Sequence, residues 1–265
     1  MVTHMTWTPD LVKRFWTGVS ASRLSELSFA RHNAGYLVEL VREHLTPDGR
    51  HLDFGAGEGH LTKVLLDQGF RTAIFEPVGS RLSQMPEAIA AHPLFLGTTD
   101  DHSTERFDVV LLADVVEHIL DQDLQPVLHR LRSLLTERGV VIVTTPYAED
   151  LELGAAYCPT CRTLFHRWQH VRSFTRESLA ALFETQGFER VRLQEVDFSC
   201  NRYRYADSKT LYEAYEAVRT RHARSWLARV RRFLGYSDKI PYIQPQSSPT
   251  GVPTHFLYVG RAKGR

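Results

Sequence analysis

The sequence predicts an α/β fold in which a mostly parallel sheet is covered by helices on both faces. From residue 51 to residue 146, short apolar runs alternate with amphipathic stretches, as strands alternate with helices in βαβ units. Three glycines stand between the first apolar run and the first amphipathic stretch, which is typical of a tight strand-to-helix turn. At 265 residues, 43% of them hydrophobic, the chain is long enough to bury one large core.

The first expected element is a helical cap at residues 1–45. Within residues 22–45, apolar side chains recur at helical spacing and share one face. They are Leu27, Ala30, Ala34, Leu37, Val38, Val41 and Leu45. Pro47 and Gly49 then end the helix.

The core is expected at residues 46–198, with residues 254–265 completing it. Its strands are predicted at 51–54, 72–76, 94–97, 107–113, 140–145, 188–198 and 254–262. Its helices are predicted at 61–68, 80–91, 124–135 and 175–186. Thr175 can cap the last of these helices and Gly187 ends it. Residues 199–253 interrupt the core as an insertion, helical over about 207–235 and rich in Pro and Ser over 240–253.

Charge and composition exclude several classes of protein. The formal net charge is +1, so overall charge gives no reason to expect a nucleic-acid partner. No apolar run is long enough to span a bilayer, and the N-terminus lacks the apolar segment of a secretory signal. We therefore expect a cytoplasmic protein. Its three cysteines argue against a disulfide framework and are free to bind metal.

The glycine-rich turn lies in "HLDFGAGEGHL", residues 51–61. Gly55, Gly57 and Gly59 allow a sharp turn and the close approach of a ligand, although a tight turn alone would also account for them. The third glycine comes one residue too early for the dinucleotide fingerprint, and no Walker lysine follows. Acids stand nearby instead: Asp53 before the loop, and Glu76 after the next strand, where a carboxylate can accept both hydroxyls of a ribose.

On these motifs the chain resembles the class I S-adenosylmethionine-dependent methyltransferases. The resemblance rests on "LDFGAGEG", on Glu76, on "FDVVLLADVVEHI" (107–119) and on "GVVIVTTP" (139–146), in this order and spacing. It implies a Rossmann-like sheet of seven mostly parallel strands, with the last strand antiparallel, and S-adenosyl-L-methionine as cofactor.

The resemblance also implies the cofactor-binding residues. Backbone groups of the glycine loop would contact the methionine part, Glu76 would hold the ribose, and an acid near residues 98–101 would flank the adenine, with Asp100 and Asp101 both available. The full set is Asp53, Gly55, Ala56, Gly57, Glu76, Pro77, Thr98, Asp100, Ala113 and Asp114.

A catalytic base is expected where "DVVEH" (114–118) leaves the fourth core strand, because sites of this fold lie at the carboxyl edge of the sheet. His118 would take the proton of a hydroxyl nucleophile, with Glu117 beside it; alternatively, both only shape the cofactor pocket or cap the next helix. The stretch is also similar to ubiquinone-pathway O-methyltransferases and to small-RNA 2′-O-methyltransferases. The latter resemblance implies an alternative divalent-metal cluster of Asp114, Glu117, His118 and His170.

Two cysteines and two histidines have metal-ligand spacing in "YCPTCRTLFHRWQH", residues 157–170. Cys158, Cys161, His166 and His170 would form a closed, structural Zn²⁺ site within a zinc-knuckle-like insertion at 155–174. A redox pair, a coincidental loop, and assignment of His170 to the active site are the alternatives. Cys200 could replace the fourth ligand.

The sequence thus predicts an S-adenosylmethionine-dependent methyltransferase acting on an oxygen of a small molecule or sugar. The alternatives are a metal-assisted RNA 2′-O-methyltransferase, a non-catalytic methyltransferase-like binding protein and, disfavoured by the glycine spacing, a nicotinamide-dependent oxidoreductase. Residues 199–253 would lie on the substrate side. The Arg-rich stretch at 219–232 is either a solvated helix face or a contact for an anionic acceptor or a membrane surface. The oligomeric state stays open.

Overall fold

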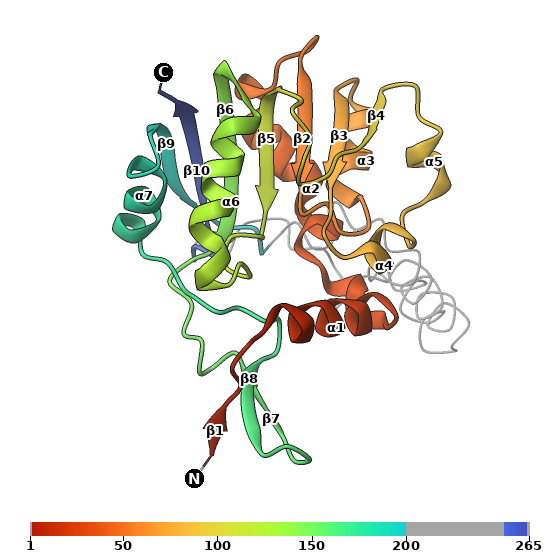
Figure 1. Ribbon diagram of the computed structural model, residues 1–265. Coiled ribbons are helices and arrows are strands. Elements are labelled where there is room, and N and C mark those ends of the chain that lie inside the picture. Colours follow the sequence, from red (N-terminus) through yellow and green to blue (C-terminus); the bar gives the residue numbers. More distant parts are fainter. Residues whose placement is uncertain (1, 200–251, 264–265) are drawn as a thin grey trace, which may run out of the picture.

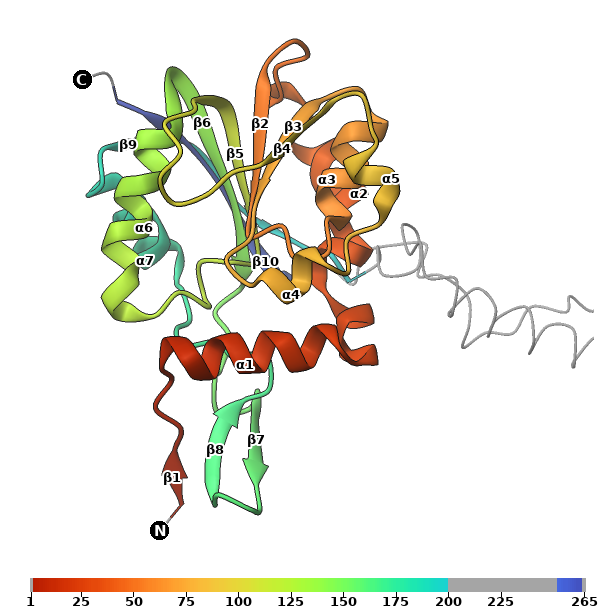
Figure 2. The same cartoon turned by 45° about the vertical axis from the view of Figure 1, so that its right-hand side comes forward.

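The computed structural model of the chain describes residues 2–199 and 252–263. Its main body is a seven-stranded sheet with helices on both faces, and a three-stranded sheet projects from one end (Figures 1 and 2). In spatial order the seven strands are β4 (Phe95–Thr98), β3 (Arg71–Phe75), β2 (Arg50–Phe54), β5 (Phe107–Ala113), β6 (Leu135–Pro146), β10 (His255–Ala262) and β9 (Phe188–Val196).

The pairing confirms the predicted fold class. Strands β4, β3, β2, β5 and β6 pair in parallel, while β10 runs antiparallel between β6 and β9. The chain therefore has the Rossmann-like architecture with its last strand reversed, and the order of the strands changes direction between β2 and β5. Ligands of open α/β sheets bind at the carboxyl ends of the strands beside such a switch point.

The sheet is buried on both faces, which is why its strands read as continuous apolar runs. Helices α6 (Asp121–Leu134) and α7 (Arg176–Glu184) cover one face, and Leu128 and Phe183 enter the core there. Helices α2 (Phe29–Val41) and α3 (His60–Asp67) cover the other, through Leu37 and Leu65.

The N-terminal cap differs from the single helix expected at 22–45. The chain forms a short 3₁₀ helix η1 (Arg23–Leu27), then α2, then a 3₁₀ turn η2 (Arg42–His44), because Ser28 is extended and interrupts the helix. A further helix, α1 (Pro9–Ser20), precedes them, and the Thr8 hydroxyl caps it. Figures 1 and 2 show α1 lying across the sheet at the carboxyl ends of its strands.

Helix prediction also missed a break at Pro86, which separates α4 (Gly79–Leu82) from α5 (Glu87–Ala90) within the expected helix 80–91.

The expected insertion falls almost wholly outside the described residues, at 200–251, and so do Cys200 and the Arg-rich stretch. Among the described residues, no helix is both long and apolar enough to cross a membrane.

The segment expected to be a zinc knuckle forms a β-hairpin. Its strands are β7 (Ala155–Cys158) and β8 (Thr163–His166), and the N-terminal strand β1 (Thr3–His4) adds to β8 in parallel. The hairpin points away from the main sheet (Figures 1 and 2), while residues 169–172 return to the carboxyl end of β5.

Candidate active site

The glycine loop between β2 and α3 has the close-approach geometry that its sequence predicts. Gly55, Gly57 and Gly59 all have positive φ, at 80°, 58° and 80°, where residues with a Cβ are strained. The N–H groups of Gly55 and Ala56 donate to the carbonyl of Phe75 over 2.8 and 3.1 Å. A Cβ on Gly57 would lie only 2.5 Å from Nη2 of Arg81, so glycine at this position lets the Arg81 guanidinium approach the backbone of the loop closely.

Glu76 lies directly against this loop, although it is nineteen residues further along the chain. Its carboxylate accepts the N–H of Gly57 over 2.8 Å and that of Val78 over 2.9 Å. These bonds use one lone pair on each oxygen, which leaves one on each for further donors. Pro77, between Glu76 and Val78, is exposed.

Arg81 is a residue of this site that the sequence reasoning missed. Its Nη1 lies 3.7 Å from Oε2 of Glu76, and its guanidinium stacks 4.5 Å from the ring centroid of Trp16 on α1. Its Nε is buried without a partner among the described residues. The sequence did offer one signal for this residue, an arginine five positions after Glu76, the acid that follows β3. Arg81 thereby connects the glycine loop to the helix that covers it.

Asp53 faces α3 rather than the open side of the loop. Its Oδ2 accepts the N–H of Thr62 over 3.0 Å and the Thr62 hydroxyl over 2.7 Å. Burial raises the pKa of Asp53 to about 6, although the Thr62 bonds oppose that shift. The carboxyl therefore holds the first turn of α3, a structural role that the sequence did not suggest.

The segment after β4 presents a buried hydroxyl between exposed residues. Thr98 and Asp100 are exposed, and Oδ1 of Asp100 accepts the N–H of His102 over 2.9 Å in a local turn. Thr99 is buried, and its hydroxyl has no partner among the described residues. Thr98 and Asp100, which were predicted to flank the adenine, thus lie at the carboxyl end of β4. Thr99 lies with them and was not predicted.

The exit from β5 is strained at Asp114. Ala113 ends the strand, and Asp114 adopts a φ of 53°, in the left-handed region that non-glycine residues seldom occupy outside functional sites. The conformation is fixed by Thr144, whose hydroxyl donates to Oδ1 over 2.7 Å, and by His255, whose Nε2 lies 3.0 Å from Oδ2. His255 on β10 was not predicted, because only tertiary structure brings β10 beside β5's exit.

Glu117 follows as a buried carboxyl group, 1% exposed. Its Oε2 accepts the Thr145 hydroxyl over 3.1 Å, and Oε1 has no hydrogen-bond partner among the described residues. Burial, reinforced by the charge of Asp114, raises the pKa of Glu117 well above its usual value. Both effects favour the protonated form of this carboxyl group over its charged form.

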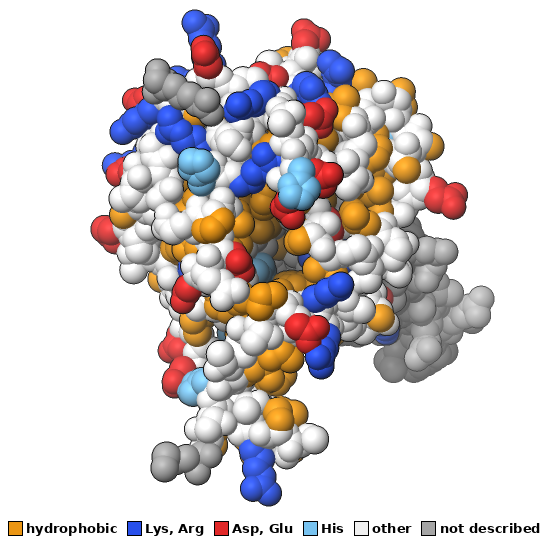
Figure 3. Space-filling view, in the orientation of Figure 1, with side chains coloured by type: hydrophobic (Ala, Val, Ile, Leu, Met, Phe, Trp, Pro, Cys, Tyr) orange, Lys and Arg blue, Asp and Glu red, His pale blue; other side chains and the backbone are white. Residues whose placement is uncertain are grey.

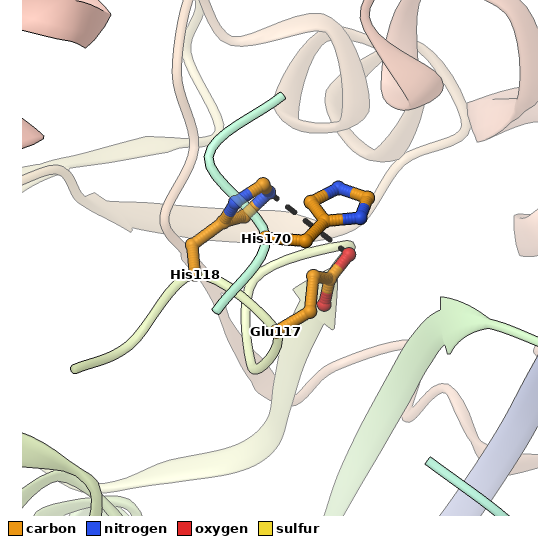
Figure 4. A group of neighbouring side chains, drawn as sticks. All are labelled: Glu117, His118 and His170. Atoms are coloured by element: carbon orange, nitrogen blue, oxygen red, sulfur yellow. Dashed lines mark ion pairs between the residues drawn. The ribbon is translucent and has the colours of Figure 1, made fainter. Parts of the chain in front are cut away.

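His118 lies beside Glu117, with Nε2 3.9 Å from Oε1 (Figure 4). Burial, followed by the charge of His170, lowers the pKa of His118 well below its usual value, so the ring is neutral. Its Nδ1 is buried without a hydrogen-bond partner in the described part of the chain. The Trp16 indole covers the ring edge-on, with centroids 4.9 Å apart, and donates to Gln169 over 2.9 Å.

His170 joins this group from a distant part of the sequence. Its ring centroid lies 4.8 Å from that of His118 and 4.2 Å from that of His166. The return segment is bonded to the exit of β5, because Val171 donates to the Glu117 carbonyl over 2.9 Å and Arg172 to the Val116 carbonyl over 2.8 Å. Figure 4 shows Glu117, His118 and His170 gathered at one place.

Glu149 is a second residue that the sequence did not single out. It forms a short hydrogen bond with Nδ1 of His170, and its Oε1 lies 3.2 Å from Nε2 of His166. Burial acts to raise its pKa, but the bonds from the two histidines outweigh burial and lower the pKa to about 2. Glu149 is therefore an ionised carboxylate that fixes the orientation of His170.

The four ligands predicted for zinc are not brought together. Cys158 pairs with Thr163 and Ala155 with His166, so the cysteines and His166 lie at opposite ends of the hairpin. Nδ1 of His166 accepts the N–H groups of Trp168 and His170, and its Nε2 faces Glu149 rather than the cysteines. The structure thus does not show the predicted Cys₂His₂ site, because the two cysteines and His166 are apart.

Two other groups could hold a metal ion among the described residues. In each, ligand atoms of three residues lie within 4.8 Å of one another: Glu117, His118 and His170 in one, and Glu149, His166 and His170 in the other. The first contains three residues of the predicted alternative cluster. Asp114, the fourth, is absent from it because its carboxylate bonds to Thr144 and His255.

A hollow lies between the sheet and α1, with a histidine side chain at its back (Figure 3). A separate cavity of about 410 Å³ reaches His166 and His170 from the side of the hairpin, lined also by residues 4–7, 120–122, 151, 152, 155, 164, 165 and 171. Its lining includes Asp121 and Glu152 but no lysine or arginine. The histidines can thus be reached by small molecules.

The family follows from comparison with known proteins. A family model described as "Methyltransferase domain" matches residues 28–193, more than half of the chain. The chain therefore belongs to this methyltransferase family.

Individual relatives agree on the fold and differ in their chemistry. The chain is 29% identical over 188 residues to a ubiquinone biosynthesis O-methyltransferase of Azorhizobium caulinodans, covering 62% of this chain and 72% of the relative. It resembles the structure of Burkholderia thailandensis 1,6-didemethyltoxoflavin-N1-methyltransferase with bound S-adenosylhomocysteine, at TM-score 0.57 and 15% identity, covering 99% and 93% of the two chains. It also resembles the [4+2]-cyclase SpnF, at TM-score 0.51 and 17% identity, covering 87% and 81%. Fold alone therefore does not choose the reaction.

Proposed function

We propose that this methyltransferase transfers a methyl group to an oxygen atom of a small molecule or sugar. The observation that carries the proposal is the meeting of His118, His170 and ionised Glu149 at the carboxyl end of β5. A hydroxyl nucleophile must lose a proton during methyl transfer, and a buried imidazole next to a carboxylate is suited to accept it. The 29% identity to a ubiquinone biosynthesis O-methyltransferase supports oxygen as the acceptor atom.

The residues beside the glycine loop fit S-adenosyl-L-methionine. Glu76 keeps one lone pair on each oxygen for two ribose hydroxyls. The unpartnered hydroxyl of Thr99 can bond an adenine nitrogen. We assign the predicted residues Asp53, Gly55, Ala56, Glu76, Pro77, Thr98, Asp100, Ala113 and Asp114 to the surroundings of this cofactor. When bound, the cofactor supplies an electrophilic methyl group.

Within this proposal, His170 acts as the base. The ionised carboxylate of Glu149 accepts from Nδ1 of His170, which leaves the lone pair of Nε2 to take the proton, whereas burial and the charge of His170 lower the pKa of His118. His118, with its unpartnered Nδ1, would instead bond the acceptor hydroxyl. This assignment shifts the role of base from His118, which the sequence favoured, to His170.

The experiment is to incubate the protein with S-adenosylmethionine and fractionated cell extract, and to measure formation of S-adenosylhomocysteine. We expect His170→Asn to lower turnover at least 100-fold and His118→Asn to raise KM more than it lowers kcat, while both variants keep cofactor affinity. Glu76→Ala is the control that loses cofactor binding. Methylation of nitrogen, or an unchanged His170→Asn enzyme, would refute the proposal.

A second candidate is metal-assisted methyl transfer, which the group of Glu117, His118 and His170 favours. Oε1 of Glu117 and Nδ1 of His118 are buried and unpartnered, as the ligands of a divalent ion would be without it. Such an ion would bind the acceptor oxygen and lower its pKa, which is the chemistry that the predicted alternative, an RNA 2′-O-methyltransferase, would need. Turnover that is lost with EDTA and restored by Mg²⁺ or Mn²⁺ would select this mechanism.

The acceptor is proposed to be uncharged where it meets the cavity beside His170. Asp121 and Glu152 line that cavity, and no lysine or arginine does. Asp121 is paired with Arg172 over 2.6 Å, so the carboxylate of Glu152 is what disfavours an anionic group at this point. The Arg-rich stretch at 219–232 suggested an anionic acceptor as one alternative. The lining of this cavity argues against an anionic group in the part of the acceptor that lies in it.

A further inference from the structure

Cys158 and Cys161 are left without a role by the methyl-transfer site. Cys158 ends β7, and Cys161 lies in the turn that leads to β8. Cys161 is exposed and Cys158 is partly exposed. The turn is at the free end of the hairpin, far from the sheet (Figures 1 and 2). The thiols are therefore accessible from outside.

The turn holds both sulfur atoms in an arrangement suited to a metal. The N–H of Arg162 donates to the Cys158 carbonyl over 2.8 Å, and Arg162 takes a φ of 59°, which closes the turn tightly. Sγ of Cys161 lies 2.9 Å from the Thr163 hydroxyl. The spacing Cys-x₂-Cys is also the one with which structural zinc sites present a pair of thiolate ligands.

The described part of the chain offers these thiols no further ligand. No group of three potential metal ligands there includes a cysteine, and His166 and His170 bond to Glu149 at the other end of the hairpin. Structural zinc takes four ligands, so two thiolates make only half a site.

We propose that Cys158 and Cys161 form one half of a zinc site that the same two cysteines of a second copy of this chain complete. The contact is isologous, with a two-fold axis through the zinc ion, so it closes as a dimer. Four thiols bind one Zn²⁺ and release four protons, leaving a centre of net charge −2 and no change in oxidation state. One exposed Arg162 from each copy lies beside the centre and offsets that charge.

The shape of the molecule permits this contact. The hairpin extends beyond the main body, so two free ends can meet without the bodies colliding, and a positively charged side chain marks that end (Figure 3). Exposed Tyr157 on β7, 50% accessible, would gain a neighbour in the partner's hairpin.

The test uses the full chain purified without chelator under reducing conditions. Elemental analysis is expected to give half an equivalent of zinc per chain, and light scattering after size-exclusion chromatography is expected to give a dimer. EDTA should remove the zinc and yield monomer, and added Zn²⁺ should restore the dimer. Cobalt(II) in place of zinc should show the absorption of tetrahedral thiolate coordination.

Variants separate this site from its alternatives. Cys158→Ser with Cys161→Ser should give a zinc-free monomer with unchanged circular dichroism and melting temperature, since both positions lie at the hairpin end. Cys200→Ser is the matched control and should keep zinc and dimer. One zinc per monomer, zinc lost with Cys200→Ser, a Cys158–Cys161 disulfide under these conditions, or no zinc at all would each overturn the proposal.

Discussion

Replacing Asp53 with asparagine should stabilise the fold at neutral pH. Asp53 is 2% exposed, and its pKa rises from 3.8 to about 6 in the folded chain because of burial. The folded state therefore prefers the protonated carboxyl. Ionisation costs about 1.4 kcal/mol for each unit of this shift, or about 3 kcal/mol in total above pH 6.

The sign follows from proton binding. Between about pH 4 and pH 6 the folded chain retains a proton on Asp53 that the unfolded chain has lost, so wild-type stability falls as the pH rises. An asparagine carbonyl still accepts both Thr62 bonds and never ionises. Its amide group needs a partner of its own, which can cost about 1 kcal/mol. We therefore expect Asp53→Asn to gain about 2 kcal/mol at pH 7.5 and to lose up to about 1 kcal/mol at pH 4, where only the cost of the amide remains.

The assay is urea unfolding of both proteins at pH 4, 5.5 and 7.5, with Asp48→Asn as the control that removes an exposed carboxylate. The gain should grow with pH for Asp53→Asn alone. A gain that is equal at all three pH values, or a variant less stable than wild type at pH 7.5, would refute the reasoning. Affinity for S-adenosylmethionine should fall in the same variant, because a negative charge is removed beside the glycine loop.

Three further changes have defined outcomes. Gly57→Ala should cost about 1–2 kcal/mol of stability, because Gly57 has a positive φ, and calorimetry should show that cofactor binding is abolished. Gly69 has a φ of 90° and open space around it, so the control Gly69→Ala should cost similar stability and leave cofactor binding intact. Tyr258→Phe should stabilise the protein by about 1 kcal/mol in thermal melts, because the hydroxyl is buried without a partner among the described residues; a loss above 1 kcal/mol would contradict this. Glu149→Gln should lower turnover by roughly 10-fold or more, because Nδ1 of His170 loses the carboxylate that orients the ring; an unchanged turnover would show that Glu149 does not position His170 for the reaction.

Much of the fold was determined by local sequence. Apolar runs at 107–113 and 140–145 predict buried parallel strands because both of their faces must meet helices. The glycine loop and Glu76 were recognisable because their chemistry depends on backbone freedom and on the end of a strand, which are local properties. The same holds for His118, which directly follows β5.

Tertiary structure alone decided how distant residues meet. Glu149 and His170 lie 21 residues apart and come together because the chain leaves β6, forms a hairpin and returns to the exit of β5. His255 reaches Asp114 from 141 residues away because β10 inserts antiparallel next to β6. The zinc prediction from 157–170 was incomplete for a related reason. Spacing counts residues along the chain, but β pairing placed Cys158 and His166 at opposite ends of one hairpin, where no single ion can bind both.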